Sequence, residues 1–425
     1  MGRKMKDSGI EWIGEIPEGW EVLAHKYIMH KEKSICEHYS GEDVISLTLS
    51  GVVKRDLENP SGKMPTTFDG YQFVDPNDLL LCLFDIDVTP RCVGLVKDYG
   101  VTSPAYSRFK IHSGFCNAYY NYLLRFIDDE KVFVHLSKNL RSSLTESDFG
   151  AIKTIVPPKA EQQRIADYLD NRTFEIDTLL SEARSSIEEY KKLKQAVITQ
   201  AVTKGVRGER VMKDSGSTRF GQIPTDWKLS RVGLHFSIIL GKMLCNAPLN
   251  DTYTLEPYYC AADVHFDGVA DGERKKMWFS PIEKDLYRVS VGDLLVVEGG
   301  AGAGGSAIVE NQDSYTYIQN SIMIVRSKGN TDNRYLRYLL EFLVKQGYID
   351  IVCNKATIPH FTKDKLSCVP FCLCPTGEQK EIADYLDAKC AEIDRLIAKK
   401  EQLVKELESY KKSLIYEVVT GKREV

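Results

Sequence analysis

The sequence has no long hydrophobic run, no large excess of charge of one sign and no regular spacing of cysteines. No apolar segment reaches the length of a membrane span, and no charged-then-apolar leader follows Met1. The eleven cysteines are odd in number and lie in mostly apolar surroundings, which favours free thiols over a disulfide framework. These absences predict a soluble, cytoplasmic protein that does not contact a membrane.

The overall charge gives no support for nucleic-acid binding. The formal net charge at pH 7 is −4. If the chain binds DNA, its basic groups must be gathered on one face, or a partner must supply some of them.

Signatures of several enzyme classes are missing. The chain contains neither the Asn-Pro-Pro-Tyr or Asp-Pro-Pro-Tyr sequence of a base methyltransferase nor a Gly-Lys-Thr/Ser phosphate loop. Asp85 and Asp87 lack the companion Glu-x-Lys of a metal nuclease, and we interpret them as a solvated strand edge. We therefore expect no catalytic residue.

A glycine-rich segment fits a cofactor motif only in part. Gly300–Gly305 follows the Gly-x-Gly-x-x-Gly pattern of dinucleotide-binding proteins. That pattern requires a helix directly afterwards and an acid about 20 residues on, whereas Ser306–Val309 reads as a strand and no acid lies near position 320. A nucleotide-cofactor enzyme stays an alternative, which a helix after Gly305 would favour.

Four residues near the second repeat could suggest zinc. His360, Cys368, Cys372 and Cys374 lie close together in sequence but lack the paired Cys-x-x-Cys knuckles of most zinc sites. Cysteines in a buried strand explain the alternation at Cys372 and Cys374 better, so we expect no metal.

A long stretch occurs twice, and it dominates the sequence. The segments that begin Glu161-Gln162 and Glu378-Gln379 share most of their first ten residues, and the match resumes further on at the same offset. Neither Glu161–Thr203 nor Glu378–Thr420 contains glycine or proline. The chain is therefore an internal duplication, and both copies predict long helices.

Both copies show the spacing of a coiled coil. Apolar or long side chains in the second copy recur at alternating steps of four and three residues, which is a heptad seam. A helix over Glu161–Thr203 would be about 65 Å long, too long for one helix inside a globular domain. Each seam needs a partner, and the other copy is the most available one. The assigned seam residues are Ile165, Leu169, Ile176, Leu179, Ile187, Ile382, Leu386, Ile393, Leu396, Leu403 and Leu407.

A shorter repeat precedes each body of the chain. Met5–Gly9, followed by a Gly-x-Ile-Pro-x-x-Trp sequence ending at Trp20, recurs as Met212–Gly216 and a copy ending at Trp227. The bodies between these segments and the helices contain short apolar runs separated by turn signals, which predict strands. The order of these runs is the same in both bodies, but the letters hardly match.

The paired motifs resemble a known family over essentially the whole chain. Pro157-Pro158 before Glu161-Gln162, its counterpart with Cys374-Pro375, and the duplicated opening segment resemble the specificity subunit of type I restriction–modification systems. The resemblance implies an α+β fold: two similar mixed α/β target-recognition domains separated by two long antiparallel coiled-coil helices, with a pseudo-two-fold internal repeat. It implies four parts: recognition domain 1–157 with repeat segment 1–22, helix 158–204, connector and second domain 205–374, and helix 375–425.

The resemblance also implies function and partners. Each domain would read one half of an asymmetric, two-part sequence in double-stranded DNA, and the chain would dock two methyltransferase subunits and two restriction/translocase subunits. S-adenosylmethionine, ATP and Mg²⁺ would belong to those partners, with no cofactor in this chain. A coiled-coil scaffold with two protein-binding modules is the other alternative, which the absence of a positive face would favour.

Candidate DNA contacts lie in polar loops of the two bodies. Asn and Gln suit adenine, Arg suits guanine, and Lys suits phosphate. The candidates are Lys54, Arg55, Lys63, Ser103, Tyr106, Arg108 and Arg141 in the first body, and Lys275, Lys276, Gln319, Asn320, Lys355, Thr357 and His360 in the second.

Overall fold

The computed structural model covers the whole chain and describes residues 3–49, 51–59, 65–137, 142–311, 315–353 and 359–425. The chain divides into two compact units. The first unit combines Met1–Arg184 with Glu401–Val425, and the second is Ser185–Lys400. Over the described residues, every helix is too short or too polar to cross a bilayer.

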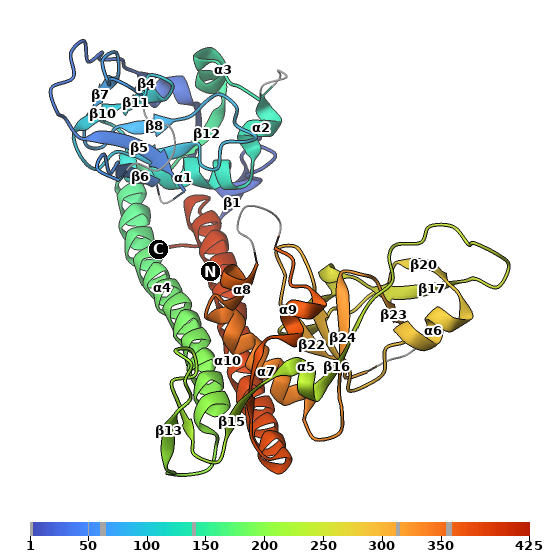
Figure 1. Cartoon of the computed structure of the whole chain (residues 1–425). Helices are drawn as coiled ribbons and strands as arrows, with labels where there is room; N and C mark the ends of the chain where they lie inside the picture. The colour runs from blue at the N-terminus through green and yellow to red at the C-terminus, as the bar shows by residue number, and fades with distance from the viewer. Residues whose placement is uncertain (1–2, 50, 60–64, 138–141, 312–314, 354–358) are drawn as a thin grey trace. The chain divides into compact units, whose positions relative to one another are not determined.

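The two long helices that the sequence predicts are present (Figure 1). They are α4 (Lys159–Lys204) and α10 (Thr376–Val419). Within the first unit, the beginning of α4 shares one core with the end of α10, through residues such as Ile165 and Val418. Within the second unit, the end of α4 packs with the beginning of α10, through residues such as Val202 and Ile382. The helices are therefore antiparallel within each unit.

The buried stripe of these helices departs from the predicted seam at two positions. Leu179 is 50% exposed and Leu403 is 39% exposed, while the neighbouring Leu180 is buried and Val404 is partly buried. The side chains that are buried or partly buried keep the seven-residue repeat, but the second seam position of each heptad lies one residue after the predicted one, at Leu180 and Val404. Leu396 and Leu407 are partly buried, and the other seam residues are buried.

The first domain, the part of the first unit before α4, contains two four-stranded sheets. One is antiparallel, in the order β4-β11-β8-β9, and the other has the order β6-β5-β10-β7, with β10 parallel to β5. Helix α1 (Asn117–Asp129) joins the core of the first sheet. The strands are β4 (Met29–Lys31), β5 (Val44–Thr48), β6 (Gly51–Lys54), β7 (Gln72–Val74), β8 (Leu79–Leu81), β9 (Val93–Leu95), β10 (Gly100–Thr102) and β11 (Ser107–Ile111).

The second domain, residues 210–375, follows the same plan. Its antiparallel sheet has the order β16-β24-β21-β22, and a three-stranded sheet has the order β20-β17-β23, with β23 parallel to β17. Helix α7 (Asn333–Lys345) occupies the place of α1. The strands are β16 (Phe236–Leu240), β17 (Thr254–Tyr259), β20 (Lys276–Phe279), β21 (Leu294–Val297), β22 (Ser306–Ile308), β23 (Tyr317–Ile318) and β24 (Ile322–Ser327).

Short elements complete each unit. In the first unit, β1 pairs with β2 and β12 pairs with β3, and in the second, β13 pairs with β14 and β15 pairs with β25. These elements are β1 (Met5–Asp7), β2 (Glu15–Pro17), β3 (Glu21–Ala24), η1 (His25–Tyr27), α2 (Val132–Leu136), α3 (Glu146–Ala151), β12 (Lys153–Val156), β13 (Met212–Asp214), β14 (Gln222–Pro224), β15 (Lys228–Arg231), α5 (Val232–His235), η2 (Ala261–Asp263), β18 (Val264–His265), β19 (Gly268–Val269), α6 (Pro281–Tyr287), α8 (Tyr348–Val352), α9 (Lys363–Ser367) and β25 (Pro370–Leu373).

Candidate nucleic-acid interface

The repeated Glu-Gln pair at the start of each long helix attaches that helix to its own domain. In the first unit, the buried indole of Trp20 donates a 3.0 Å hydrogen bond to Glu161, which also pairs with Arg3. The amide of Gln162 donates to the Pro157 carbonyl over 2.8 Å and accepts from the backbone N–H of Cys116 over 2.8 Å. The side chain of Gln162 therefore joins the helix start to the beginning of α1.

The second unit repeats these contacts. Trp227 donates to the buried carboxylate of Glu378 over 3.2 Å, and Arg210 pairs with the same group. Gln379 donates to the Cys374 carbonyl over 2.7 Å and accepts from the backbone N–H of Asp332 over 3.0 Å. The sequence repeat is therefore a structural attachment, used once in each unit.

In each domain an arginine of the antiparallel sheet pairs with the aspartate just before the neighbouring strand, and this pair is buried in the first domain and partly exposed in the second. The guanidinium Nε of Arg108 lies 2.5 Å from Asp78, and the Arg108 side chain is only 2% exposed. In the second domain, Arg326 binds Asp293 through two nitrogens, at 2.7 and 2.6 Å. Burial and pairing with carboxylates argue against a contact between Arg108 and a base edge, and the predicted DNA contact of Arg108 stays untested.

The first long helix of each domain carries a further sequence repeat. Helix α1 reads Asn-x-Tyr-x-x-Tyr-Leu-Leu from Asn117, and α7 reads the same from Asn333. Both asparagine amides donate to a backbone carbonyl over 2.6 Å. Tyr122 and Tyr338 each donate to an aspartate of a long helix over 2.7 Å. The spacing of asparagine and tyrosine was the signal that could have revealed these attachments.

Four candidates of the first domain lie around the sheet β6-β5-β10-β7. Lys54 ends β6, and Arg55 follows it. Ser103 and Tyr106 follow β10, where Gln72 holds their turn by donating to the Ser103 and Tyr106 carbonyls over 3.1 and 2.6 Å. The half-exposed Lys54 ammonium donates a hydrogen bond to Asp43 over 2.8 Å, which raises the pKa of Lys54.

Four candidates of the second domain take matching places in β20-β17-β23. Lys275 and Lys276 lie at the start of β20, which pairs with β17 as β6 pairs with β5. Gln319 and Asn320 follow β23, as Ser103 follows β10. The Gln319 amide oxygen accepts from the Ser321 hydroxyl over 2.6 Å. Each sheet thus brings cationic and hydrogen-bonding side chains together, and their contact with DNA stays a prediction.

Of the remaining candidates, one lies beside the glycine-rich loop and four lie outside the residues that the structure describes. His360 is exposed, and its Nδ1 lies 3.4 Å from Glu298, beside the bridge between His360 and Gly299. Lys63, Arg141, Lys355 and Thr357 lie outside the residues that the structure describes.

The glycine-rich loop is a hairpin and does not begin a helix. Gly300–Gly305 connects β21 to β22, which are antiparallel neighbours. A dinucleotide site of the Gly-x-Gly-x-x-Gly type needs a helix N-terminus directly after the loop. Here the strand β22 follows, which argues against the nucleotide-cofactor alternative. Cys372 and Cys374 are buried, and burial raises the pKa of the Cys372 thiol to about 12. No group of three metal-ligating side chains gathers within the described residues.

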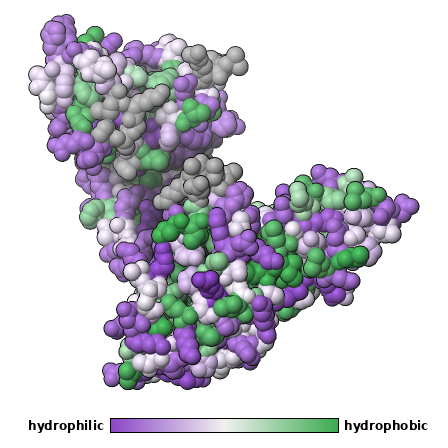
Figure 2. Space-filling model, in the orientation of Figure 1, coloured by the Kyte–Doolittle hydropathy of each residue, from purple (hydrophilic) through white to green (hydrophobic). Residues whose placement is uncertain are grey.

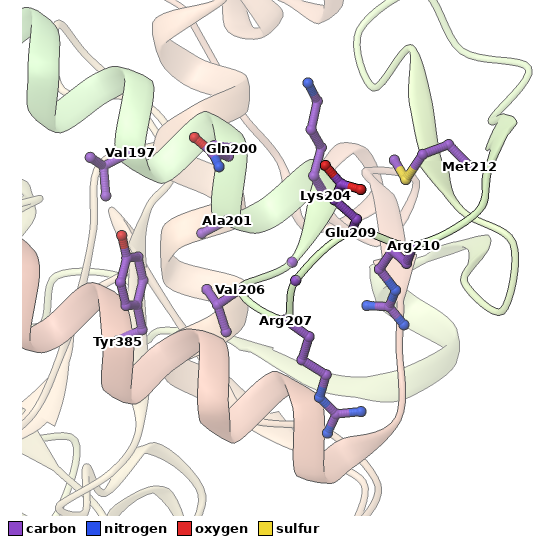
Figure 3. Close-up of a pocket in the computed structure, with 12 residues that line it drawn as sticks. Val197, Gln200, Ala201, Lys204, Val206, Arg207, Glu209, Arg210, Met212 and Tyr385 are labelled. Carbon is purple, nitrogen blue, oxygen red and sulfur yellow. The ribbon is translucent and has the colours of Figure 1, made fainter.

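A groove of about 580 Å³ lies beside the end of α4, where the chain leaves the helix (Figure 3). Lys204, Arg207 and Arg210 line it, and Tyr385 projects toward it from α10. Two of the three cations are neutralised, because Arg207 lies 2.7 Å from Glu381 and Arg210 lies 2.9 Å from Asp226. We assign no ligand to this groove.

Comparisons with known proteins agree with a duplicated protein that recognises DNA. A family model described as the type I restriction modification DNA specificity domain matches residues 225–407. The putative type I restriction enzyme MjaX specificity subunit of Methanocaldococcus jannaschii is 28% identical over 314 residues, which cover 72% of this chain and 67% of the relative. The MjaVIII specificity subunit of the same organism is 25% identical over 289 residues, which cover 64% of this chain and 63% of that relative.

Two solved structures share the fold. A chain from a structural study of complex assembly and conformational transition of the type I R-M system has a TM-score of 0.71 and 16% identity, and the match covers 96% of this chain and 99% of that one. The HsdS subunit from Thermoanaerobacter tengcongensis has a TM-score of 0.55 and 16% identity, with 96% and 98% covered. The chain is therefore similar to the specificity subunits of type I restriction–modification systems over most of its length, and residues 225–407 match the DNA specificity domain of that family.

Proposed function

We propose that this chain is the non-catalytic, DNA-reading subunit of a type I restriction–modification complex, and that each domain reads one half of a two-part DNA sequence. The observation that carries the proposal is the duplication itself. Two domains share a sheet order and the same Glu-Gln and Trp attachments to a long helix, yet differ in the side chains that they expose. Two like modules with different surfaces are suited to two different half-sites.

The exposed faces of the long helices support docking of methyltransferase subunits. Phe174 and Leu179 on α4 are 74% and 50% exposed, and Tyr410 on α10 is 49% exposed. Large apolar side chains on the outside of a coiled coil are typical of a helix that binds a further partner. Two methyltransferase and two restriction/translocase subunits would follow from the two-fold repeat.

The chemistry would then reside in the partners. S-adenosylmethionine would bind the methyltransferase subunits, and ATP and Mg²⁺ would bind the restriction subunits. This chain would supply sequence recognition and geometry only.

The test is a methylation map of DNA from cells that express this chain with its cognate methyltransferase subunit. We expect methylated adenines within one asymmetric, two-part sequence with a fixed gap. A complex that forms and methylates DNA without such a sequence, or that does not methylate at all, would remove the DNA-reading function and favour a protein-binding scaffold.

A further inference from the structure

An exposed apolar segment lies on the DNA-reading sheet of the second domain. The connection between β16 and β17, residues 241–253, exposes Met243 by 75%, Leu244 by 52% and Leu249 by 79%. Figure 2 shows hydrophobic residues among polar ones on the lobe that carries β17 and β20. Single exposed apolar residues need no explanation, but a group within a few residues of chain suggests a contact.

The equivalent connection of the first domain differs. It joins β4 to β5 through residues 32–43, and Ile35 is its one exposed large hydrophobic residue. The sheet orders match, so the two connections occupy the same place in the two domains. The apolar group is thus a feature of one reading domain and not of the common scaffold.

The backbone on both sides of Met243 and Leu244 is fixed to the sheet. The Lys242 carbonyl accepts from the Asn320 N–H over 2.8 Å, and the Lys242 ammonium lies 2.6 Å from Glu283. The Cys245 carbonyl accepts from the Trp278 N–H over 3.0 Å. The two apolar residues are therefore held in place directly beside Asn320, one of the candidates for reading a base.

The surroundings favour DNA over a protein partner. Leu255 of β17 is exposed and lies opposite Trp278 of β20, the strand that begins at Lys276. Lys275 and Lys276 are both exposed and, within the described part of the chain, form no salt bridge. Apolar side chains held beside an asparagine, and next to a strand that begins with these lysines, match one apolar group of the major groove, the C5-methyl of thymine.

We propose that Met243 and Leu244 contact thymine methyl groups in the half-site that the second domain reads. The inference rests on the proposed function and deepens it, since it names the chemical group that this surface recognises. It also predicts that this half-site contains at least one A·T pair whose thymine methyl contributes to recognition.

The experiment replaces thymine by uracil, which removes only the methyl group. DNA duplexes carrying the mapped target receive uracil at one position at a time, and binding of the full chain with its methyltransferase partner is measured. We expect the wild type to bind at least one substituted duplex about fourfold more weakly, the loss that one buried methyl group accounts for. The double variant M243S/L244S should bind the thymine duplex more weakly and no longer distinguish thymine from uracil at that position.

Matched controls separate the possible outcomes. Ile35→Ser in the first domain should leave the response to uracil in the second half-site unchanged. An equal thymine preference in the wild type and in M243S/L244S, or a half-site without A·T pairs, overturns the inference. The inference is also overturned if M243S/L244S keeps the preference for thymine but no longer binds the methyltransferase subunit, because the surface would then bind protein. Absence of any sequence-specific DNA binding by the wild type refutes the proposed function instead.

Discussion

Replacing Gln379 by leucine tests the attachment between the second domain and its helix. The Gln379 side chain is fully buried and joins two backbone groups, the Cys374 carbonyl at 2.7 Å and the Asp332 N–H at 3.0 Å. Leucine has a similar volume but can satisfy neither group. A buried backbone group without a partner costs about 1–3 kcal/mol, so the loss of both partners should cost the second unit about 2–6 kcal/mol of stability.

Hydrogen exchange measures this loss locally. The amides of α7 follow directly after Asp332, so their protection depends on the attachment. A loss of about 2 kcal/mol corresponds to exchange about 30 times faster in native conditions. Gln402→Leu is the matched control, because Gln402 is exposed on the same helix α10 and should leave α7 unchanged. Acceleration below about threefold for Gln379→Leu would refute the reasoning.

Three further predictions follow from burial and charge. Leu414→Asp should cost several kcal/mol in thermal unfolding, whereas Leu403→Asp should cost little, since these residues are 1% and 39% exposed. Replacing Lys275 and Lys276 by alanine should leave unfolding unchanged and lower the salt slope of DNA binding by about two, as binding titrations would show. Burial lowers the pKa of His25 from 6.5 to about 4, so stability of the first unit should fall by about 3 kcal/mol between these pH values, and melts of His25→Gln should show less of this loss.

The sign of the His25 effect follows from proton binding. Between pH 6.5 and about 4, the unfolded chain protonates this histidine while the folded protein keeps it neutral, with Nδ1 3.2 Å from the Phe149 carbonyl. The first unit therefore has its full stability above pH 6.5 and loses part of it as the pH falls from 6.5 to about 4.

The repeated scaffold could be predicted from the sequence because its signals are long. Absence of glycine and proline, with apolar spacing over more than 40 positions, is enough to define α4 and α10 within two residues at either end. The one-position difference at Leu179 and Leu403 arises because each has an apolar neighbour, Leu180 and Val404, so the spacing alone does not decide which of the two is buried.

The candidate contacts could be predicted less well, because polarity alone does not distinguish surface from interior. Arg108 lies in a polar segment, but its partner Asp78 comes from a strand 30 positions earlier, a pairing that only the sheet defines. Conversely, Met243 and Leu244 look like core residues in sequence, and the anchoring of Lys242 and Cys245 on the sheet leaves them exposed.

The most direct test of the account is an exchange of one body. Residues 23–157 are replaced by the corresponding body of another specificity subunit, and the methylated sequence is mapped with the cognate methyltransferase. The account predicts that one half of the two-part sequence changes while the other half stays as it was. A change in both halves, or in neither, would contradict the assignment of one half-site to each domain.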